Sequence, residues 1–159
     1  MSEKTNERDE RRGNYPHFLQ IPTRWMDNDV YGHVNNVTYY SYFDTAVNEF
    51  LMRFTGLDYR KKEPVGMVVE TGCRFHSEIA FPDVLDVGVR VRRLGNSSVT
   101  YEIGIFKQGS ETPSATGHFV HVYVRPGEMK PIPVPDHVRA GLAPLVVADK
   151  SDAGPPASG

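Results

Sequence analysis

Hydrophobic residues change their spacing once along this chain, and the change predicts a helix followed by a sheet. Over residues 37–54 the large apolar side chains recur every three or four positions, as Tyr39, Phe43, Val47, Phe50 and Phe54. That is the period of an α-helix with a buried face. Asn35 or Asn36 can cap its start, and Gly56 can end it. Neighbouring apolar residues widen the stripe, so we expect the helix to be largely buried.

Beyond the helix the apolar period falls to two, which is typical of half-buried β-strands. The alternating runs cover residues 67–76, 85–92, 99–106 and 114–125. An earlier strand is expected over residues 18–26, and a short final helix is expected from Asp136. One long helix with about five antiparallel strands predicts an α+β fold in which the sheet wraps the helix.

The two ends of the chain are poor in apolar side chains. The first 14 residues are dense in charges of both signs, and the chain ends in the small, polar sequence DKSDAGPPASG. Such segments bury too little apolar surface to fold. We therefore expect disordered tails over residues 1–14 and 146–159 around a single domain of residues 15–145. Deleting residues 1–13 and 150–159 is expected to leave activity nearly unchanged.

Composition narrows the classes of protein and partner. The formal net charge is −2, which gives no reason to expect nucleic acid or an anionic membrane surface as a partner. No apolar run is long enough to cross a bilayer, and the charged N-terminus lacks the apolar core of a secretory signal. Cys73 is the single cysteine, so an intramolecular disulfide is excluded and a cytoplasmic location fits. We expect Cys73 to be a small core residue.

A dense polar motif, DNDVYGHVNN, occupies residues 27–36 just before the predicted helix. The start of a helix carries unpaired N–H groups and a partial positive charge, so it can stabilise an oxygen that becomes negative during a reaction. A nearby carboxylate can act as base or nucleophile on the same carbon. Acyl transfer or hydrolysis is the reaction class that follows. Chemistry alone does not choose between Asp27 and Asp29.

The same region resembles the signature of the 4-hydroxybenzoyl-CoA thioesterase family of hotdog-fold acyl-CoA thioesterases. The pattern Asp-x-Asp-x-x-Gly, then Asn-Asn, then Tyr-x-x-Tyr-Phe-acid is found here in RWMDNDVYGHVNNVTYYSYFD, residues 24–44. The stretches RVRRLGNSSVTYEI from Arg90 and RPGEMKPIPVPDHV from Arg125 are also similar to the family. The similarity covers roughly residues 17–145 and implies a hotdog fold.

The resemblance implies an enzyme that hydrolyses an acyl thioester, of coenzyme A or of acyl-carrier protein, to the free acid and the thiol. Asp29 would be the catalytic carboxylate, as nucleophile or general base, and the backbone N–H of Asn36 would polarise the thioester carbonyl. The residues between them would bind substrate: Tyr31, Gly32, His33 and Val34. Sites in this family lie between two subunits and use neither a metal nor an organic cofactor. Many members have an arginine soon after the helix acid, where this chain has none, so the acyl specificity stays open.

Several of these residues have alternative interpretations. Asp29 could simply turn the loop, whereas Asp27 is expected to hold the loop by accepting N–H bonds. His33 could be a base instead of a scaffold residue. Asp44 or Glu49 on the helix could supply the carboxylate, as in related hotdog enzymes. We expect no metal at this motif, because ligands at this density usually need a further His or Cys close by.

Four residues around the predicted turn LGNSS are candidates for binding coenzyme A: Arg92, Arg93, Ser97 and Ser98. Guanidinium forks and hydroxyl groups suit phosphates. The ordinary alternative is a solvated face of a strand.

Two other functions stay open, a hotdog hydratase or dehydratase on acyl thioesters and a non-catalytic acyl-CoA binding module. The first usually needs a His with an acid on or beside the helix, and the predicted helix contains no His. The second could lose the acid, but Asp29 is present. One thin core with open sheet edges favours pairing with a second copy, so we expect a homodimer or homotetramer.

Overall fold

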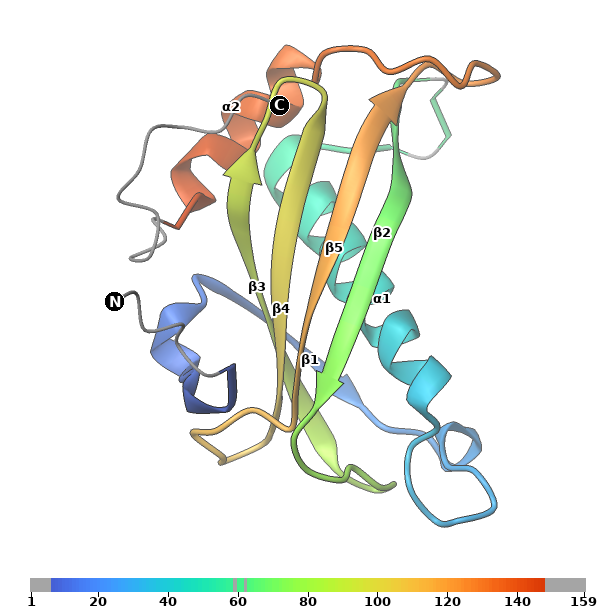
Figure 1. The fold of residues 1–159 in the computed structure, drawn as a ribbon, viewed down its shortest axis with the longest axis vertical. Coiled ribbons are helices and arrows are strands. Elements are labelled where there is room, and N and C mark those ends of the chain that lie inside the picture. The colour runs from blue at the N-terminus through green and yellow to red at the C-terminus, as the bar shows by residue number, and fades with distance from the viewer. Residues whose placement is uncertain (1–6, 59, 62, 148–159) are drawn as a thin grey trace, which may run out of the picture.

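The computed structural model describes residues 7–58, 60–61 and 63–147. Five strands form one antiparallel sheet in the order β1-β3-β4-β5-β2, with the long helix α1 (Asn36–Thr55) across one face (Figure 1). The strands are β1 (His17–Pro22), β2 (Val65–Phe75), β3 (Val84–Leu94), β4 (Ser98–Lys107) and β5 (Ala115–Val124). The shorter elements are η1 (Glu7–Asp9), η2 (Arg12–Asn14), η3 (Trp25–Asp27), α2 (Asp136–Leu142) and η4 (Ala143–Leu145). The predicted α+β hotdog architecture is confirmed.

Helix α1 begins and ends where the sequence predicts. The Asn35 side chain accepts a hydrogen bond from the backbone N–H of Val37 at 3.3 Å, and Gly56 ends the helix in the left-handed region with φ of 70°. The buried face of the helix packs on the inner face of the sheet. A Cβ on Gly117 would collide with the Phe43 ring, so this glycine lets the ring rest directly on β5. No helix in the described part of the chain is long and apolar enough to cross a membrane.

Two strands differ from their predicted form. The strand expected over residues 18–26 ends at Pro22, and the chain turns instead into η3 at the edge of the polar motif. On β2 the alternation over residues 67–76 puts Val69 on the same face as Cys73, which is expected to be a core residue. A bulge shifts the register against β5, so that Val68 rather than Val69 pairs with β5 and Val69 is 59% exposed. A bulge inserts one extra residue into the strand, so the alternation of core-facing and outward-facing residues is reversed beyond it.

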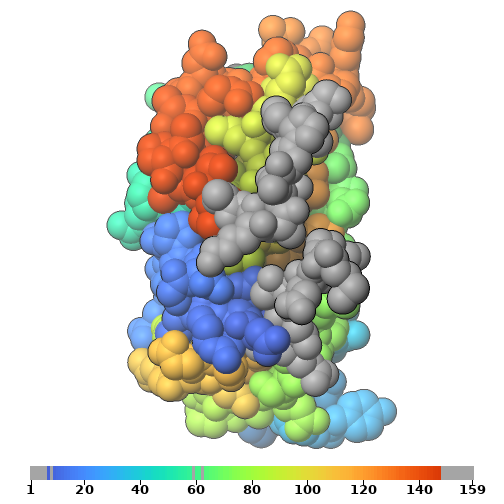
Figure 2. Space-filling view, turned by 60° about the vertical axis from the view of Figure 1, so that its left-hand side comes forward, coloured from blue at the N-terminus to red at the C-terminus, as the bar shows by residue number. Residues whose placement is uncertain are grey.

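The N-terminal segment is packed from residue 7, so the prediction of a disordered tail is wrong for residues 7–14; residues 1–6 lie outside the described part. Tyr15 is buried on the outer face of the sheet, against Gly88 and Gly104. These glycines are partners in the β3–β4 register, and a Cβ on either would come within 2.9 Å of Tyr15 atoms. The two glycines have no side chains and therefore leave room for the Tyr15 ring on the sheet. Figure 2 shows the N-terminal segment in blue beside the red C-terminal region.

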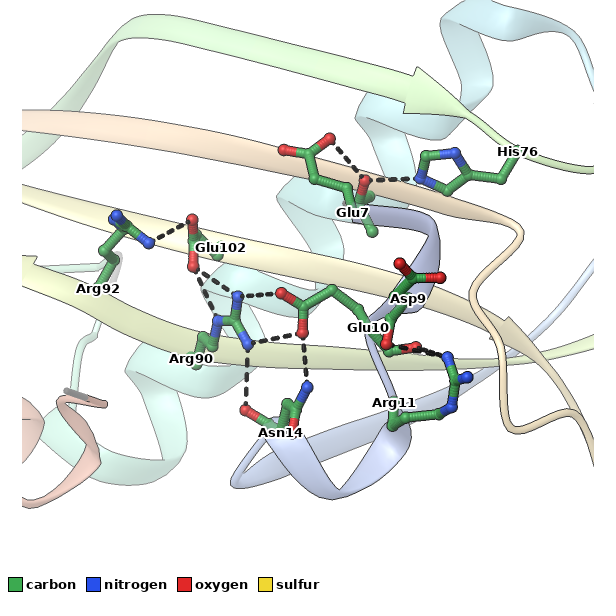
Figure 3. A network of polar contacts seen from close by, with 10 residues as sticks. Glu7, Asp9, Glu10, Arg11, Asn14, His76, Arg90, Arg92 and Glu102 are labelled. Atoms are coloured by element: carbon green, nitrogen blue, oxygen red, sulfur yellow. Dashed lines mark hydrogen bonds and ion pairs between the residues drawn. The ribbon is translucent and has the colours of Figure 1, made fainter. Parts of the chain in front are cut away.

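Complementary charges hold the same segment in place (Figure 3). Glu10 pairs with Arg90 at 3.0 Å, Arg90 pairs with Glu102 at 2.8 Å, and Arg12 pairs with Asp86 at 2.8 Å. Burial alone would raise the pKa of Glu10, but hydrogen bonds from Arg90 and Asn14 outweigh it and lower that pKa. The charged side chains of this segment led to the prediction of a disordered tail, but in the structure they form ion pairs that hold the segment on the sheet. At the other end, the Val147 N–H donates to the Val91 carbonyl at 2.9 Å, and the rest of the predicted C-terminal tail lies outside the described residues.

Deleting residues 1–13 is therefore expected to lower the melting temperature while leaving the turnover of the folded protein nearly unchanged. The deletion removes Glu10 and Arg12, and it leaves the part-buried Arg90 without one of its two carboxylates. A loss of about 1–3 kcal/mol follows, which corresponds to a fall of roughly 2–12 °C for a chain of this size. Thermal melts check this, with deletion of residues 1–6 as the control. Equal melting temperatures for both truncations would contradict the packing argument.

Candidate active site

The polar motif forms a closed loop between η3 and α1. Asn28 and Val34 make an isolated antiparallel bridge. Inside it, the Asp29 N–H donates to the His33 carbonyl at 2.9 Å, and the Gly32 N–H donates to the Asp29 carbonyl at 3.1 Å. Gly32 has φ of 85°, a conformation that favours glycine. The sequence therefore places a tight turn, with Asp29 at its base, directly before the helix.

Asp27 is a buried anchor of this loop, and its side chain is 2% exposed. Its carboxylate accepts hydrogen bonds from the Arg24 N–H at 2.9 Å, from the Arg24 guanidinium at 2.9 and 3.1 Å, and from the Tyr42 hydroxyl at 2.8 Å. Burial alone would raise the pKa of Asp27, but these bonds outweigh it and hold the pKa below its ordinary value. Its backbone carbonyl also accepts from the Asn35 N–H at 2.9 Å. Asp27 thereby ties the loop to the start of α1.

Asp29 is only partly buried, and its carboxylate is far less committed. One oxygen accepts the Tyr31 N–H at 2.9 Å, which closes an Asx turn. In the part of the chain that the structure describes, no cation pairs with this carboxylate and no other donor reaches it. The two acids of the motif are therefore inequivalent, one saturated and buried and the other open.

The other residues predicted to bind substrate divide between surface and core. Tyr31 is 83% exposed beside Gly32, which is also exposed. The His33 side chain is 45% exposed and lies 3.0 Å from Glu78. Val34 is 6% exposed, and its N–H donates to a backbone carbonyl at 2.7 Å, so its side chain belongs to the core cluster. Asn36 is the first residue of α1, where N–H groups have no acceptor within the helix.

Exposed apolar side chains surround the loop, and sequence reasoning did not single them out. Trp25 is 77% exposed and stacks edge-on against Phe81, with ring centroids 6.0 Å apart. The Phe81 N–H donates to the Asn28 side chain at 3.0 Å, which fixes the two segments together. Met26, Val30 and Val37 are also more than half exposed. Large exposed apolar side chains grouped in one segment of the chain favour binding of a ligand or of another chain there. The only sign of these exposed apolar side chains in the sequence was the high density of apolar residues in and around a polar loop.

The four candidates for binding coenzyme A lie at the far end of the β3–β4 hairpin (Figure 1). The start of β3 is near the loop, because the Thr23 N–H donates to the Asp83 carbonyl at 3.0 Å. Ten residues of strand from there to Arg93 span roughly 33 Å. Arg92 already bonds to Glu102 at 3.2 Å. A single chain therefore does not bring Arg92, Arg93, Ser97 and Ser98 to the Asp29 loop.

The remaining candidates for catalysis have partners of their own. Glu49 bonds to His17 at 2.7 Å and to Arg53 at 2.8 Å, and its pKa is lowered because these bonds outweigh its burial. Asp44 is exposed and accepts from Asn48 at 2.9 Å. Burial raises the pKa of the Cys73 thiol to about 12, which makes it a poor nucleophile. No group of three or more His, Cys, Asp or Glu residues suited to a metal ion is found in the described ranges.

One family model and several solved structures are similar to this chain. The model of the thioesterase-like superfamily matches residues 23–142. The crystal structure of the PA5185 protein from Pseudomonas aeruginosa strain PAO1 is 48% identical, with a TM-score of 0.83 over 86% of this chain and 96% of that one. A gentisyl-coenzyme A thioesterase is 26% identical, with a TM-score of 0.71 over 79% and 99% of the two chains. A thioesterase from Thermus thermophilus, complexed with coenzyme A and Zn, is 28% identical, with a TM-score of 0.70 over 83% and 95%.

Proposed function

Because the chain belongs to the thioesterase-like superfamily, we propose that it hydrolyses an acyl-CoA thioester with Asp29 as the catalytic carboxylate. The observation behind this choice is the contrast between the two acids of the loop. Asp27 uses its lone pairs on four hydrogen bonds in the interior. The carboxylate of Asp29, in the loop before α1, is partly exposed and accepts one hydrogen bond, from the Tyr31 N–H. A group that must accept a proton or attack a carbon needs such an open oxygen.

The proposed reaction uses the start of α1 as its electrostatic partner. The Asn36 N–H donates to the thioester carbonyl oxygen and stabilises the negative charge that develops there. Asp29 either takes a proton from water as the water oxygen bonds to the carbonyl carbon, or attacks that carbon itself before water releases the acid. In both routes the carbon–sulfur bond breaks, and the thiolate leaves and takes up a proton. Gly32, with φ of 85°, lets the backbone between these two groups turn sharply, and the proposed mechanism requires that both groups reach one carbon.

The likeness to a thioesterase complexed with coenzyme A supports coenzyme A as the carrier of the acyl group. Arg92, Arg93, Ser97 and Ser98 stay the proposed phosphate contacts, but the length of β3 requires that they serve the site of another subunit. The single cysteine supports a reducing compartment such as the cytoplasm.

We also propose that two copies pair through β2, which is an edge strand of 11 residues. A long exposed edge presents a row of N–H and C=O groups that a second strand can satisfy. Val65, Val68 and Val69 on this strand are 41%, 44% and 59% exposed, which is unusual for valine in a stable monomer. Antiparallel pairing of a strand with its own copy has two-fold symmetry, so this interface joins two copies and no more.

Light scattering at micromolar concentration is expected to give a dimer, or a tetramer built from dimers. Val69→Lys should shift the protein toward monomer, because a lysine on an edge strand opposes pairing. Val146→Lys is the matched control, since Val146 is 40% exposed but bridges to β3, away from the β2 edge. A stable and fully active wild-type monomer would refute the pairing.

Release of free thiol from a panel of acyl-CoA esters, followed with a thiol reagent, tests the function itself. Hydrolysis of at least one ester at a rate that depends on Asp29 supports the proposal. Water addition to an enoyl thioester without thiol release would favour the hydratase alternative. Tight binding of acyl-CoA without turnover would favour a binding module. Acyl-carrier-protein thioesters belong in the same panel, since both carriers present the same thioester.

A further inference from the structure

The loop that carries Asp29 is a hairpin of a defined type, and its hydrogen bonds place two side chains opposite one another. The Asp29 N–H donates to the His33 carbonyl at 2.9 Å, and the Gly32 N–H donates to the Asp29 carbonyl at 3.1 Å. Gly32 has φ of 82–86° in common with the other glycines that close turns in this chain, and its own value is 85°. This pattern is a hairpin loop closed by a glycine bulge, in which Gly32 and His33 together face Asp29.

The side chains of Asp29 and His33 therefore lie on the same face of the hairpin. Residues directly opposite each other in an antiparallel pair point to one side, with Cβ atoms roughly 5 Å apart. The next pair, Asn28 and Val34, points to the other side, where Val34 is buried and the Asn28 side chain accepts the Phe81 N–H. Asp29 and His33 consequently point away from the core, and both are partly exposed.

Glu78 holds one side of the His33 ring. Its Oε2 atom lies 3.0 Å from Nε2 of His33. The segment of Glu78 follows β2 and is fastened to the hairpin, because the Val34 N–H donates to the Ile79 carbonyl at 2.7 Å. Since Nε2 faces Glu78, Nδ1 is the ring nitrogen that remains for a substrate. Nδ1 is bonded to the ring carbon next to Cβ, so it lies on the side of the ring nearer to the hairpin.

The proposed hydrolysis needs a proton donor as well as a base. Asp29 accepts a proton or attacks the carbonyl carbon, so it is not free to protonate the departing sulfur in the same step. A thiolate is the reactive form of a thiol, and one that leaves without a proton can attack the acyl carbon again. Histidine gives up and regains a proton near neutral pH, which suits it to this task. The His33 side chain is 45% exposed and can regain its proton from solvent.

We propose that His33 is a further catalytic residue, which donates a proton from Nδ1 to the leaving thiolate, and that Glu78 positions its ring. The inference rests on the proposed thioesterase function and deepens it. As the carbon–sulfur bond breaks, its electron pair moves to sulfur, and sulfur takes the proton from Nδ1. Asp29 takes a proton from the attacking water, or bonds to the acyl carbon until water releases the acid. Solvent restores the proton of His33, so one water is consumed and one acid and one thiol are formed.

The ordinary alternative is that the pair of His33 and Glu78 only fastens the loop to the segment after β2. Loss of such a fastening would slow the hydrolysis of every ester by the same factor, because it would misplace Asp29 whichever thiol is leaving. Loss of a proton donor would slow only those esters whose thiolate is basic enough to need the proton. The dependence of the rate on the leaving thiol therefore separates the two roles.

The first test measures kcat/KM on esters of one acyl group with thiols of decreasing basicity, namely coenzyme A, N-acetylcysteamine, thiophenol and para-nitrothiophenol. His33→Gln should lose at least about tenfold on the two alkyl thiol esters and less than about twofold on the nitrothiophenol ester. Glu78→Gln should show the same trend with smaller losses, because the ring remains but is no longer held. It also serves if His33→Gln does not fold, since Glu78 is 76% exposed. Equal losses on every ester, or no loss on any, overturn the proposal.

His118→Gln is a matched control for these variants. His118 and Glu70 are also a histidine and a glutamate in contact, at 2.7 Å, with side chains 41% and 66% exposed. They lie on β5 and β2 and not in the hairpin. His118→Gln should therefore show no dependence on the leaving thiol beyond that of the wild type. The same trend in this variant as in His33→Gln would overturn the assignment to His33.

Rescue by imidazole is a second measurement, and it needs only acyl-CoA. His33→Ala removes the ring and leaves space on the Asp29 face of the hairpin, where imidazole from solution can donate the proton instead. Turnover of acyl-CoA by His33→Ala should rise at least about tenfold on addition of imidazole, whereas the wild type and Asp29→Asn should not respond. A folded His33→Ala protein that responds less than about twofold overturns the proposal where the aryl thiol esters are not substrates.

Failure of this inference and failure of the proposed function give different results. If the wild type hydrolyses a thioester and Asp29→Asn does not, while His33→Gln loses the same factor on every ester, the thioesterase function stands and the role of His33 is wrong. If the wild type hydrolyses no thioester, the proposed function is wrong and the role of His33 falls with it.

Discussion

Asp29→Asn is expected to lower turnover by about a hundredfold or more while leaving the fold intact. The substitution keeps the size of the side chain and its acceptor for the Tyr31 N–H, but it removes the negative charge and the basicity. A hundredfold loss is roughly 2.7 kcal/mol of activation barrier. Substrate binding should change far less, because the contacts to the acyl group and to coenzyme A remain. Steady-state kinetics on one active thioester, with a thermal melt of each variant, provides the measurement.

Two further variants decide whether the carboxylate is the right one. Glu49→Gln should stay active, because Glu49 is engaged by His17 and Arg53 on the flank of the helix. If Asp29→Asn keeps more than about a tenth of wild-type turnover while Glu49→Gln is inactive, the assignment of the carboxylate is wrong. If both variants and Asp27→Asn remain active, the carboxylate mechanism fails as a whole, and His33 becomes the next residue to replace.

The elements that follow from local sequence rules were predictable. A cap at Asn35 or Asn36, an end at Gly56 and the apolar stripe between them are local features, and α1 begins and ends at these positions with Asn35 as the cap. The strands after the helix were also read correctly in number and order, since each alternates over several residues. Hydrophobic period and terminal residues decide such elements before any tertiary contact forms.

The features that were missed depend on contacts between distant segments. Residues 7–14 have a tail-like composition, and their order comes from carboxylates and guanidinium groups on strands more than seventy positions away. Gly88 and Gly104 are the signal that was available. A glycine inside a strand often marks close approach of another group, and here both lie under Tyr15. The bulge at Val69 had no such signal, because the alternation of apolar residues continues unbroken through it.

The loop that carries the candidate site was predictable from the sequence, but the different environments of its two acids were not. The motif, the glycine and the helix start identify the loop from sequence alone. The distinction between Asp27 and Asp29 needs burial and hydrogen bonds, because both acids have the same chemistry and stand two positions apart.

Asp27→Asn is expected to act on stability more than on turnover. The Asp27 carboxylate accepts hydrogen bonds from Arg24 and from the Tyr42 hydroxyl in a nearly closed environment. An amide offers one acceptor oxygen in place of two and carries no charge. Since Arg24 is itself 65% exposed and screened by solvent, a loss of about 2 kcal/mol is expected. That corresponds to a fall of roughly 4–8 °C in melting temperature. Asp44→Asn, at an exposed carboxylate, is the control and should melt close to wild type.

The pH dependence of the stability lost in Asp27→Asn shows whether the loss comes from the charge of the buried carboxylate or from altered packing. The pKa of Asp27 is lower in the folded protein than its ordinary value, so the carboxylate stabilises the fold fully above the unfolded pKa of about 3.9. As the pH falls through the folded pKa, the folded protein takes up the proton and this contribution is lost. The difference in melting temperature between wild type and Asp27→Asn should therefore be largest near pH 7 and shrink below about pH 4. Melts of both proteins across that range provide the measurement. A difference that stays constant into acid would mean that packing, and not the charge on Asp27, holds the loop against α1.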